Sequence, residues 1–437
     1  MKIVRLACCV SAAFTLHAYA AEPAIAPATR AAFEAITADP LVKRGLEFLK
    51  ADDANTLADQ KALVVIPAPP FKEQARAENF RARLAALGLK DVRIDKESNA
   101  IGVRPGSGNG PKLVVAAHLD TVFPEGTDLT IKEKDGKLYA PSIGDDTRGL
   151  ADLLSLIRAF NATDVKTTGD IIFVGNVGEE GLGDLRGVKA LFRDDKSIDG
   201  FISIDGAEPE RITYLATGSH RYRVHFKGPG GHSFGAFGLP SAIHAMGRAI
   251  AKIGDLQTPA KPKTTFTVGT VQGGTSVNAI AGDAEMEVDM RSDDNKPLLE
   301  IEAKILQAIK NAVAEENARW KSDRITVDIK LVSDRPAGVQ PLETPTVQAA
   351  FLATHALGLK PMAEGGSSTD SNLPISLGVP AVTLGRGGKG GANHSLGEWW
   401  DPTNAYIGPQ RQFLTVLTLV GIEGVAKPLL PKRPPRQ

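Results

Sequence analysis

The sequence predicts an α/β fold: a doubly wound, mostly parallel sheet covered by helices on both faces, with an inserted α+β domain. Four short apolar runs lack polar alternation, as expected for strands buried on both faces. They are residues 113–117, 171–177, 201–204 and 381–384. Leucine and isoleucine at helical spacing over 150–157 separate the first two runs, and further helices are expected at 31–50 and 72–87. This alternation of strands and helices is typical of doubly wound folds.

The inserted domain is recognised by a different pattern. Apolar and polar residues alternate strictly over 222–226, 286–290 and 325–331, which predicts strands with one solvated face. Helices are expected from about 240 and over 297–320, with a further strand at 265–271, so the element order is βαββαβ. We therefore expect residues 30–212 and 333–427 to form one discontinuous domain and residues 213–332 to form the second.

The first twenty residues have the pattern of a secretory signal peptide. Lys2 and Arg5 precede a short apolar stretch, and residues 18–20, Ala-Tyr-Ala, match an A-x-A cleavage site. We expect residues 1–20 to be removed and the mature protein to be periplasmic or secreted. The two cysteines, Cys8 and Cys9, lie in this segment, so disulfides and thiolate metal ligands are excluded for the mature chain.

The charge balance points to a small-molecule partner. The chain has 51 Lys and Arg against 51 Asp and Glu, a formal net charge of zero. This balance argues against a general affinity for nucleic acid or anionic membranes. After the signal peptide no apolar run reaches the roughly 18 residues needed to span a bilayer. We therefore expect neither a nucleic-acid partner nor membrane association after signal cleavage.

Side chains that can bind metal ions follow each of the four apolar runs. Ligand sites of open α/β sheets lie beyond the carboxyl ends of the strands, so we expect these side chains to meet. Imidazoles and carboxylates without thiolates suit a pair of divalent ions bridged by carboxylate and water. The candidates are His118 and Asp120, Glu179 and Glu180, Asp205 and His394, together with Asp145 at the start of the following helix.

Local geometry suggests a role for several of these residues. Side chains two apart on a strand project the same way, so Asp120 is expected to accept the proton of the second ring nitrogen of His118. Adjacent residues point apart, so one of Glu179 and Glu180 coordinates and the other faces a bound water. We assign the latter role to Glu179, which as general base would pass a proton to a leaving amine. The inferred reaction is hydrolysis of an amide.

Each feature alone has an ordinary explanation. The acidic pair could be a solvated turn, Asp145 could cap the following helix, and Asp205 and His394 could be turn and loop residues. Their joint occurrence at successive strand ends favours the metal site. Asp370, in "GGSSTDSNLP", fits contact with a substrate amine and a turn equally well. The glycine-rich segments lack the P-loop ending and the Rossmann spacing, which excludes nucleotide binding.

At these residues the chain resembles the di-zinc metallopeptidase family of aminoacylase-1, acetylornithine deacetylase, succinyl-diaminopimelate desuccinylase, carboxypeptidase G and peptidase T. The motifs "HLDTV", "GDDTRG", "GEEGLG", "SIDGAE", "GPGGHS", "GGTSVNAI", "VDMR" and "HSLGE" occur in the family order. The resemblance covers nearly all of the mature chain. One departure is Thr147-Arg148, where the family commonly has Lys-Gly or Lys-Ala.

The resemblance implies two divalent metal ions per chain, most commonly zinc. Their ligands would be His118, Asp145 as bridge, Glu180, Asp205 and His394, with Glu179 activating the metal-bridged water. The inserted domain would be a lid that also forms a homodimer. Its His232 would reach the partner subunit's site and stabilise the oxyanion, while Asn278 and Arg291 would bind the substrate carbonyl and carboxylate.

The resemblance also suggests a substrate class. Members with Asp at position 205 tend to be aminopeptidases or dipeptidases, which makes small peptides the expected substrates. An N-acyl amino acid deacylase or a carboxypeptidase on the same scaffold is the alternative enzyme. A non-catalytic peptide-binding protein is the alternative of another class, and the presence of Glu179 beside a full ligand set argues against it.

Overall fold

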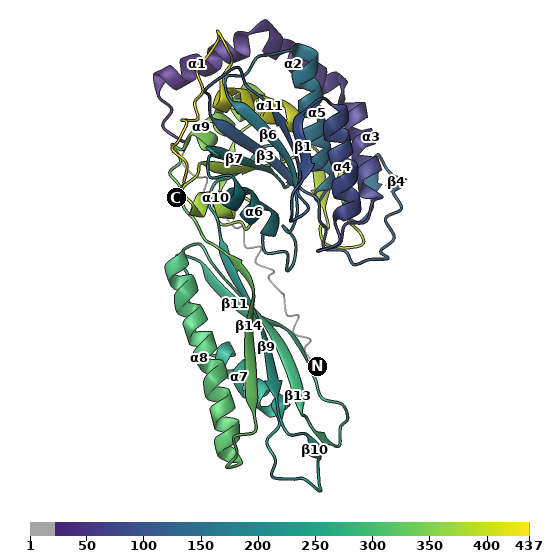
Figure 1. Ribbon diagram of the computed structural model, residues 1–437, viewed down its shortest axis with the longest axis vertical. Helices are drawn as coiled ribbons and strands as arrows, with labels where there is room; N and C mark the ends of the chain where they lie inside the picture. Colours follow the sequence, from purple (N-terminus) through teal and green to yellow (C-terminus); the bar gives the residue numbers. More distant parts are fainter. Residues whose placement is uncertain (1–21, 437) are drawn as a thin grey trace, which may run out of the picture.

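The computed structural model describes residues 22–436, which form a broad α/β domain and an elongated second domain (Figure 1). The predicted signal peptide, residues 1–20, lies outside the described residues. Among the described residues, none of the helices combines the length and the apolar character that a bilayer crossing requires. The two domains meet near the carboxyl ends of the central strands, where the candidate site lies.

The large domain is built on an eight-stranded sheet in the order β1-β2-β6-β3-β7-β16-β8-β15. The four central strands β6, β3, β7 and β16 run parallel to one another, whereas β1, β2 and β8 join through antiparallel pairs. All four predicted apolar runs are central strands. The strands are β1 (Lys90–Ile94), β2 (Ala100–Arg104), β3 (Lys112–His118), β6 (Asp170–Asn176), β7 (Gly200–Ile204), β8 (Arg211–Thr213), β15 (Met362–Glu364) and β16 (Ala381–Leu384).

Helices cover both faces of this sheet, which explains the uninterrupted apolar runs. In β3, Leu113 and Val115 pack into a core with α5 and α11, whereas Val114 and Ala116 face a second core with α6 and α10. The predicted α/β fold class is therefore confirmed. The helices are α1 (Pro27–Ala38), α2 (Pro40–Ala51), α3 (Asp53–Val64), α4 (Gln74–Ala86), α5 (Thr147–Thr163), α6 (Arg186–Asp194), α9 (Pro345–Ala356), α10 (Asn372–Ser376) and α11 (Ile407–Val420).

The helix expected over 31–50 is in fact two helices. Asp39 caps α2, its carboxylate accepting the backbone N–H groups of Leu41 at 2.8 Å and Val42 at 3.2 Å. Pro40 occupies the first position of α2. A capping aspartate followed by proline is a helix start, and this signal outweighs the continuous apolar spacing.

The second domain has a four-stranded antiparallel sheet in the order β11-β13-β9-β14. The predicted order βαββαβ is found as β9 (Gly218–Lys227), α7 (Ala242–Gly254), β11 (Thr264–Gly273), β13 (Asp283–Ser292), α8 (Asn295–Arg319) and β14 (Thr326–Arg335). Both helices pack on one sheet face through alternating side chains such as Val224, Met286 and Val288. The domain boundaries at 213 and 332 stay predictions.

Two small sheets complete the described structure. At the far end of the second domain, β10 (Gly231–His232) pairs with β12 (Ala279–Ile280). In the large domain, β17 (Lys389–Gly391) and β18 (Trp399–Asp401) form a hairpin that joins β5 (Lys137–Tyr139) and β4 (Lys132–Lys134). The hairpin follows a tight turn at Gly387 and Gly388, whose φ angles are 81° and 75°, a conformation that favours glycine.

Candidate metal centre

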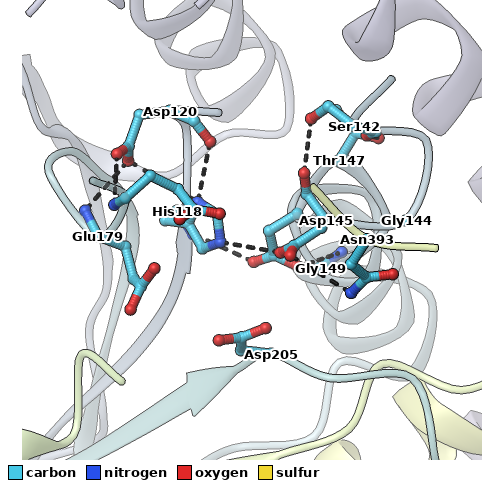
Figure 2. A network of polar contacts seen from close by, with 12 residues as sticks. His118, Asp120, Ser142, Gly144, Asp145, Thr147, Gly149, Glu179, Asp205 and Asn393 are labelled. Carbon is cyan, nitrogen blue, oxygen red and sulfur yellow. Dashed lines mark hydrogen bonds and ion pairs between the residues drawn. The ribbon is translucent and has the colours of Figure 1, made fainter. Parts of the chain in front are cut away.

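The predicted metal-binding side chains converge near the carboxyl ends of β3, β6, β7 and β16, and Figure 2 shows His118, Asp145 and Asp205 among them. All of them except His118 line a cavity of about 300 Å³. This position is where open α/β sheets form their ligand sites. The cavity lining includes Asp145, Glu179, Glu180, Asp205 and His394.

His118, the last residue of β3, is buried and oriented at both ring nitrogens. Its Nδ1 lies 3.0 Å from the backbone carbonyl oxygen of Asp120, and its Nε2 lies 3.2 Å from Oδ1 of Asp145. Because a carbonyl oxygen only accepts hydrogen bonds, Nδ1 carries the proton. Nε2 is therefore the atom available for a metal ion.

The geometry of Asp120 differs from the prediction that its carboxylate accepts the ring proton of His118. The carboxylate lies 3.7 Å from Nδ1 and instead accepts the backbone N–H groups of Gly178, Glu179 and Glu180, at 2.9, 3.2 and 2.8 Å. The reason is that β3 ends at His118, so strand alternation does not extend to Asp120. Asp120 thus orients His118 through its backbone and holds the glutamate loop through its side chain.

Asp145 occupies the turn before α5, and its carboxylate does not cap that helix but faces His118 and His394. The capping role belongs to the next residue, since the side chain of Asp146 accepts the N–H of Gly149 at 3.2 Å. Glu398 supports the turn by accepting the N–H groups of Gly144 at 2.9 Å and Asp145 at 3.0 Å.

The glutamate pair diverges as adjacent residues are expected to. Oε1 of Glu180 lies 2.9 Å from Nε2 of His394, which is also 3.4 Å from Asp145. These two carboxylates raise the pKa of His394 to about 10. Glu179 instead faces Arg335, whose Nη1 lies 3.3 Å from Oε1 and whose Nη2 donates to the Glu179 carbonyl. Burial raises the pKa of Glu179 well above its usual range, although Arg335 opposes this shift.

Two overlapping groups of side chains are arranged to hold metal ions. His118, Asp145 and Glu180 form one, and Asp145, Asp146 and Asp205 form the other, with the ligand atoms of each within 4.8 Å of one another. Asp145 belongs to both, as a bridging carboxylate would. Imidazole and carboxylate donors suit zinc and similar divalent ions, so the residues present fit a metal pair.

A buried arginine that sequence reasoning missed also contacts the second group. Nη1 of Arg386 lies 2.6 Å from Asp146, 3.3 Å from Asp145 and 3.4 Å from Asp205. Its guanidinium partly neutralises the carboxylates that a second ion would use. Arg335 and Glu398 were missed as well. The only sequence signal for Glu398 is its place in "HSLGE", and no local pattern marks either arginine.

The Thr147-Arg148 departure has a structural role. The Thr147 hydroxyl donates to the carbonyl oxygen of Ser142 at 2.7 Å. Arg148 is buried, pairs with Asp152 at 2.7 Å and stacks on Trp400 with its guanidinium 4.9 Å from the ring centre. These contacts fix the start of α5 behind the metal centre.

The predicted residues of the second domain lie apart from this centre. His232 and Asn278 belong to the β10–β12 region at the end of the domain remote from the central sheet (Figure 1). Nδ1 of His232 accepts the N–H groups of Phe234 and Gly235, both at 3.2 Å, so Nε2 carries the proton. Arg291 lies nearer, in a cavity at the domain junction.

Asp370, for which two roles were open, is buried beneath the centre. Its Oδ2 accepts the side-chain N–H of Asn176 at 2.7 Å, whereas its Oδ1 has no hydrogen-bond partner. Burial raises the pKa of Asp370 to about 7. Asp370 does not line the cavity that contains the metal-binding groups.

A two-domain α/β protein with a carboxylate and imidazole centre in a cleft belongs to the class of metal-dependent hydrolases. Comparison with known proteins identifies the family. The model of peptidase family M20/M25/M40 matches residues 114–410. The protein belongs to this family, whose members hydrolyse peptide and other amide bonds and typically bind metal ions.

Individual relatives illustrate the range of the family. The chain is 23% identical to the succinyl-diaminopimelate desuccinylase of Corynebacterium glutamicum over 79% of this chain and 91% of the relative. It is 24% identical to carboxypeptidase G2 of a Pseudomonas species over 72% and 77% of the two chains. The crystal structure of aminopeptidase PepT from Bacillus cereus superposes with a TM-score of 0.67 at 21% identity, covering 83% of this chain and 98% of that one.

Proposed function

We propose that the protein is an exported di-zinc hydrolase that cleaves small peptides in the manner of an aminopeptidase or dipeptidase. One observation carries the catalytic part of this proposal. Glu179 borders the cavity with the ligand candidates Asp145, Glu180, Asp205 and His394, yet its carboxylate pairs with Arg335 and with none of them. A carboxylate beside a metal centre but outside its ligand set is suited to proton transfer.

When bound, the zinc ions supply Lewis-acid activation of a water molecule and of the substrate carbonyl. Side chains of the protein transfer the proton and hold the base in place. Glu179 removes a proton from the attacking water and delivers it to the amine nitrogen as the C–N bond breaks. Burial raises the pKa of Glu179, which makes its carboxylate a stronger base for this exchange. Arg335 holds the Glu179 side chain and backbone in place.

The proposed substrate class rests on Asp205, because family members with Asp at this position tend to be aminopeptidases or dipeptidases. N-acyl amino acids are the alternative, favoured by the deacetylase and desuccinylase relatives. A panel of dipeptides, tripeptides, N-acetyl amino acids and peptides with C-terminal glutamate separates the two. Hydrolysis of free-amino peptides at a kcat/KM at least tenfold above acylated analogues is expected. The opposite order would replace the peptidase assignment with a deacylase.

One set of experiments tests both the metal dependence and the role of Glu179 as general base. Metal analysis of the purified protein is expected to find close to two divalent ions per chain, and chelation is expected to abolish turnover. Glu179→Gln should keep the metal content while lowering kcat by roughly 10²- to 10⁴-fold, the usual contribution of general acid–base catalysis. A metal-free enzyme with full activity, or full turnover by Glu179→Gln, would refute the mechanism.

We also propose that the active unit is a homodimer. His232 is exposed, carries its proton on Nε2 and lies at the end of the second domain remote from the metal centre of its own chain. A donor in this position could stabilise an oxyanion in a second subunit. Mixing inactive His232→Ala and Glu179→Gln subunits is expected to restore part of the activity. Absence of recovery despite demonstrated subunit exchange would contradict the shared site.

Export is the remaining part of the proposal and rests on the N-terminal sequence pattern alone. Expression of the full chain in a bacterium with two membranes, followed by fractionation and N-terminal sequencing, is the direct test. We expect a periplasmic or secreted product that begins near Ala21. An uncleaved protein in the cytoplasmic fraction would reject the localisation.

A further inference from the structure

A second cavity of about 300 Å³ lies at the domain junction beside the metal centre. Its lining consists of Thr217, Lys263, Thr265, Arg291, Asp293 and residues 366–368. Ser367 and Ser368 also line the cavity of the metal centre. The two cavities are therefore neighbours that share this segment of the chain.

Four of the side chains that line the junction cavity come from one end of the second domain's sheet. Thr265 of β11 pairs in register with Arg291 of β13, and the N–H of Asp293 donates to the Lys263 carbonyl at 3.2 Å. Lys263 and Asp293 lie just beyond the ends of these two strands. All four residues therefore meet at the same cavity.

The lining carries an excess of positive charge. Lys263 is exposed and makes no ion pair within residues 22–436. Arg291 donates from Nε to Asp289 at 2.9 Å, and its terminal nitrogens have no hydrogen bond in the described part of the chain. Asp293 is the one acidic lining residue, and its Oδ1 already accepts the Thr217 hydroxyl at 2.6 Å.

We propose that Lys263 recognises a second carboxylate on the substrate, so that the enzyme prefers peptides ending in an acidic residue. This inference rests on the proposed peptidase function. Arg291, expected to bind the terminal carboxylate, presents a fork of free nitrogens suited to that planar group. Lys263, which lines the same cavity, supplies a separate point charge for the acidic side chain. Ser367 and Ser368, which line both cavities, offer hydroxyl groups between this pair and the metal centre.

The test compares Ala-Glu with Ala-Gln, which have nearly the same shape but differ by one negative charge. We expect wild-type kcat/KM to favour Ala-Glu by roughly two- to fivefold, as for one ion pair with an exposed lysine. Lys263→Gln should bring this ratio close to one, and Lys263→Glu should invert it. The ratio should also fall as salt is added.

Lys261→Gln is the matched control, since Lys261 is exposed, lies two residues away and does not line the cavity. This variant should keep the wild-type ratio. A wild-type ratio near one, a preference for Ala-Lys through Asp293, or an unchanged ratio in Lys263→Gln would overturn the inference.

Calorimetric binding of the same two dipeptides to zinc-loaded Glu179→Gln protein separates this inference from the proposed function. Tighter binding of Ala-Glu that depends on Lys263, without turnover by the wild type, would support the anionic site and reject the peptidase assignment. Turnover of both dipeptides with equal binding would support the peptidase assignment and reject the anionic site.

Discussion

Replacing Glu398 with glutamine tests whether a side chain outside the ligand set builds the metal centre. Oε2 of Glu398 accepts the N–H of Ser142 at 2.9 Å, and Oε1 accepts those of Gly144 and Asp145. Glutamine keeps one oxygen for two of these donors, but its amide nitrogen then faces the Ser142 N–H. Glu398 is fully buried, so no water replaces the lost acceptor.

The size of the effect follows from these three bonds. An unsatisfied buried donor costs about 1–3 kcal/mol, and hydrogen bonds lose about 1 kcal/mol each when a charged acceptor becomes neutral. We therefore expect Glu398→Gln to lower the free energy of unfolding by about 3–5 kcal/mol. Because Asp145 loses its support, metal affinity should fall roughly 10- to 100-fold, as for other residues that orient ligands.

Two measurements check this prediction. Urea unfolding in the presence of chelator gives the stability of the metal-free protein, and competition with a chromophoric chelator gives the metal affinity. Glu423→Gln is the control, since Glu423 is exposed and its side chain makes no hydrogen bond within the described residues. Wild-type stability and metal affinity in Glu398→Gln would show that the three bonds do not determine the position of Asp145.

Three further predictions follow from individual contacts. Arg335 lowers the pKa of Glu179 against the effect of burial, so Arg335→Gln should raise that pKa and move the acid limb of the kcat/KM profile to higher pH; an unmoved limb would contradict this. With a pKa of about 10, His394 is protonated at neutral pH in the metal-free protein, and it must lose that proton to bind metal. Calorimetry in buffers of different ionisation enthalpy should therefore detect proton release, and metal affinity should increase with pH up to about 10. Arg148→Met leaves Asp152 unpaired and buried, which should cost about 3–5 kcal/mol of stability in urea unfolding. Arg148→Met combined with Asp152→Leu should recover most of that loss, and failure to do so would assign the cost to packing on Trp400.

Local sequence patterns predicted both the central strands and the ligand candidates. The physical reason is the same for both. A strand covered on both faces must be apolar throughout, so the four runs mark the centre of the sheet. The first polar residues after such runs lie at the edge where ligands bind, which brings His118, Glu180 and Asp205 together. The position of Asp120 was missed because strand alternation applies only while the chain remains extended, and β3 ends at His118.

The supporting residues could not be predicted because their partners are distant in the sequence. Arg335 ends a strand of the second domain and meets Glu179 from 156 residues away. Arg386 lies 240 residues from Asp146. Each arginine is an ordinary charged residue in its local segment. Only the tertiary structure shows that both are buried beside carboxylates, which is where a cation has most effect.

The charges of the centre explain why protons, arginines and metal ions are interdependent there. Asp145, Asp146, Glu179, Glu180 and Asp205 are close together, and burying unpaired carboxylates is strongly unfavourable. Arg335 and Arg386 neutralise only part of this charge. In the metal-free protein, protonated histidine supplies more, as the raised pKa of His394 indicates. Divalent cations at the proposed site would replace those protons. The acidic cluster is therefore stable as a group only with bound cations, whether protons or metal ions, and lower pH should weaken metal binding before it unfolds the domain.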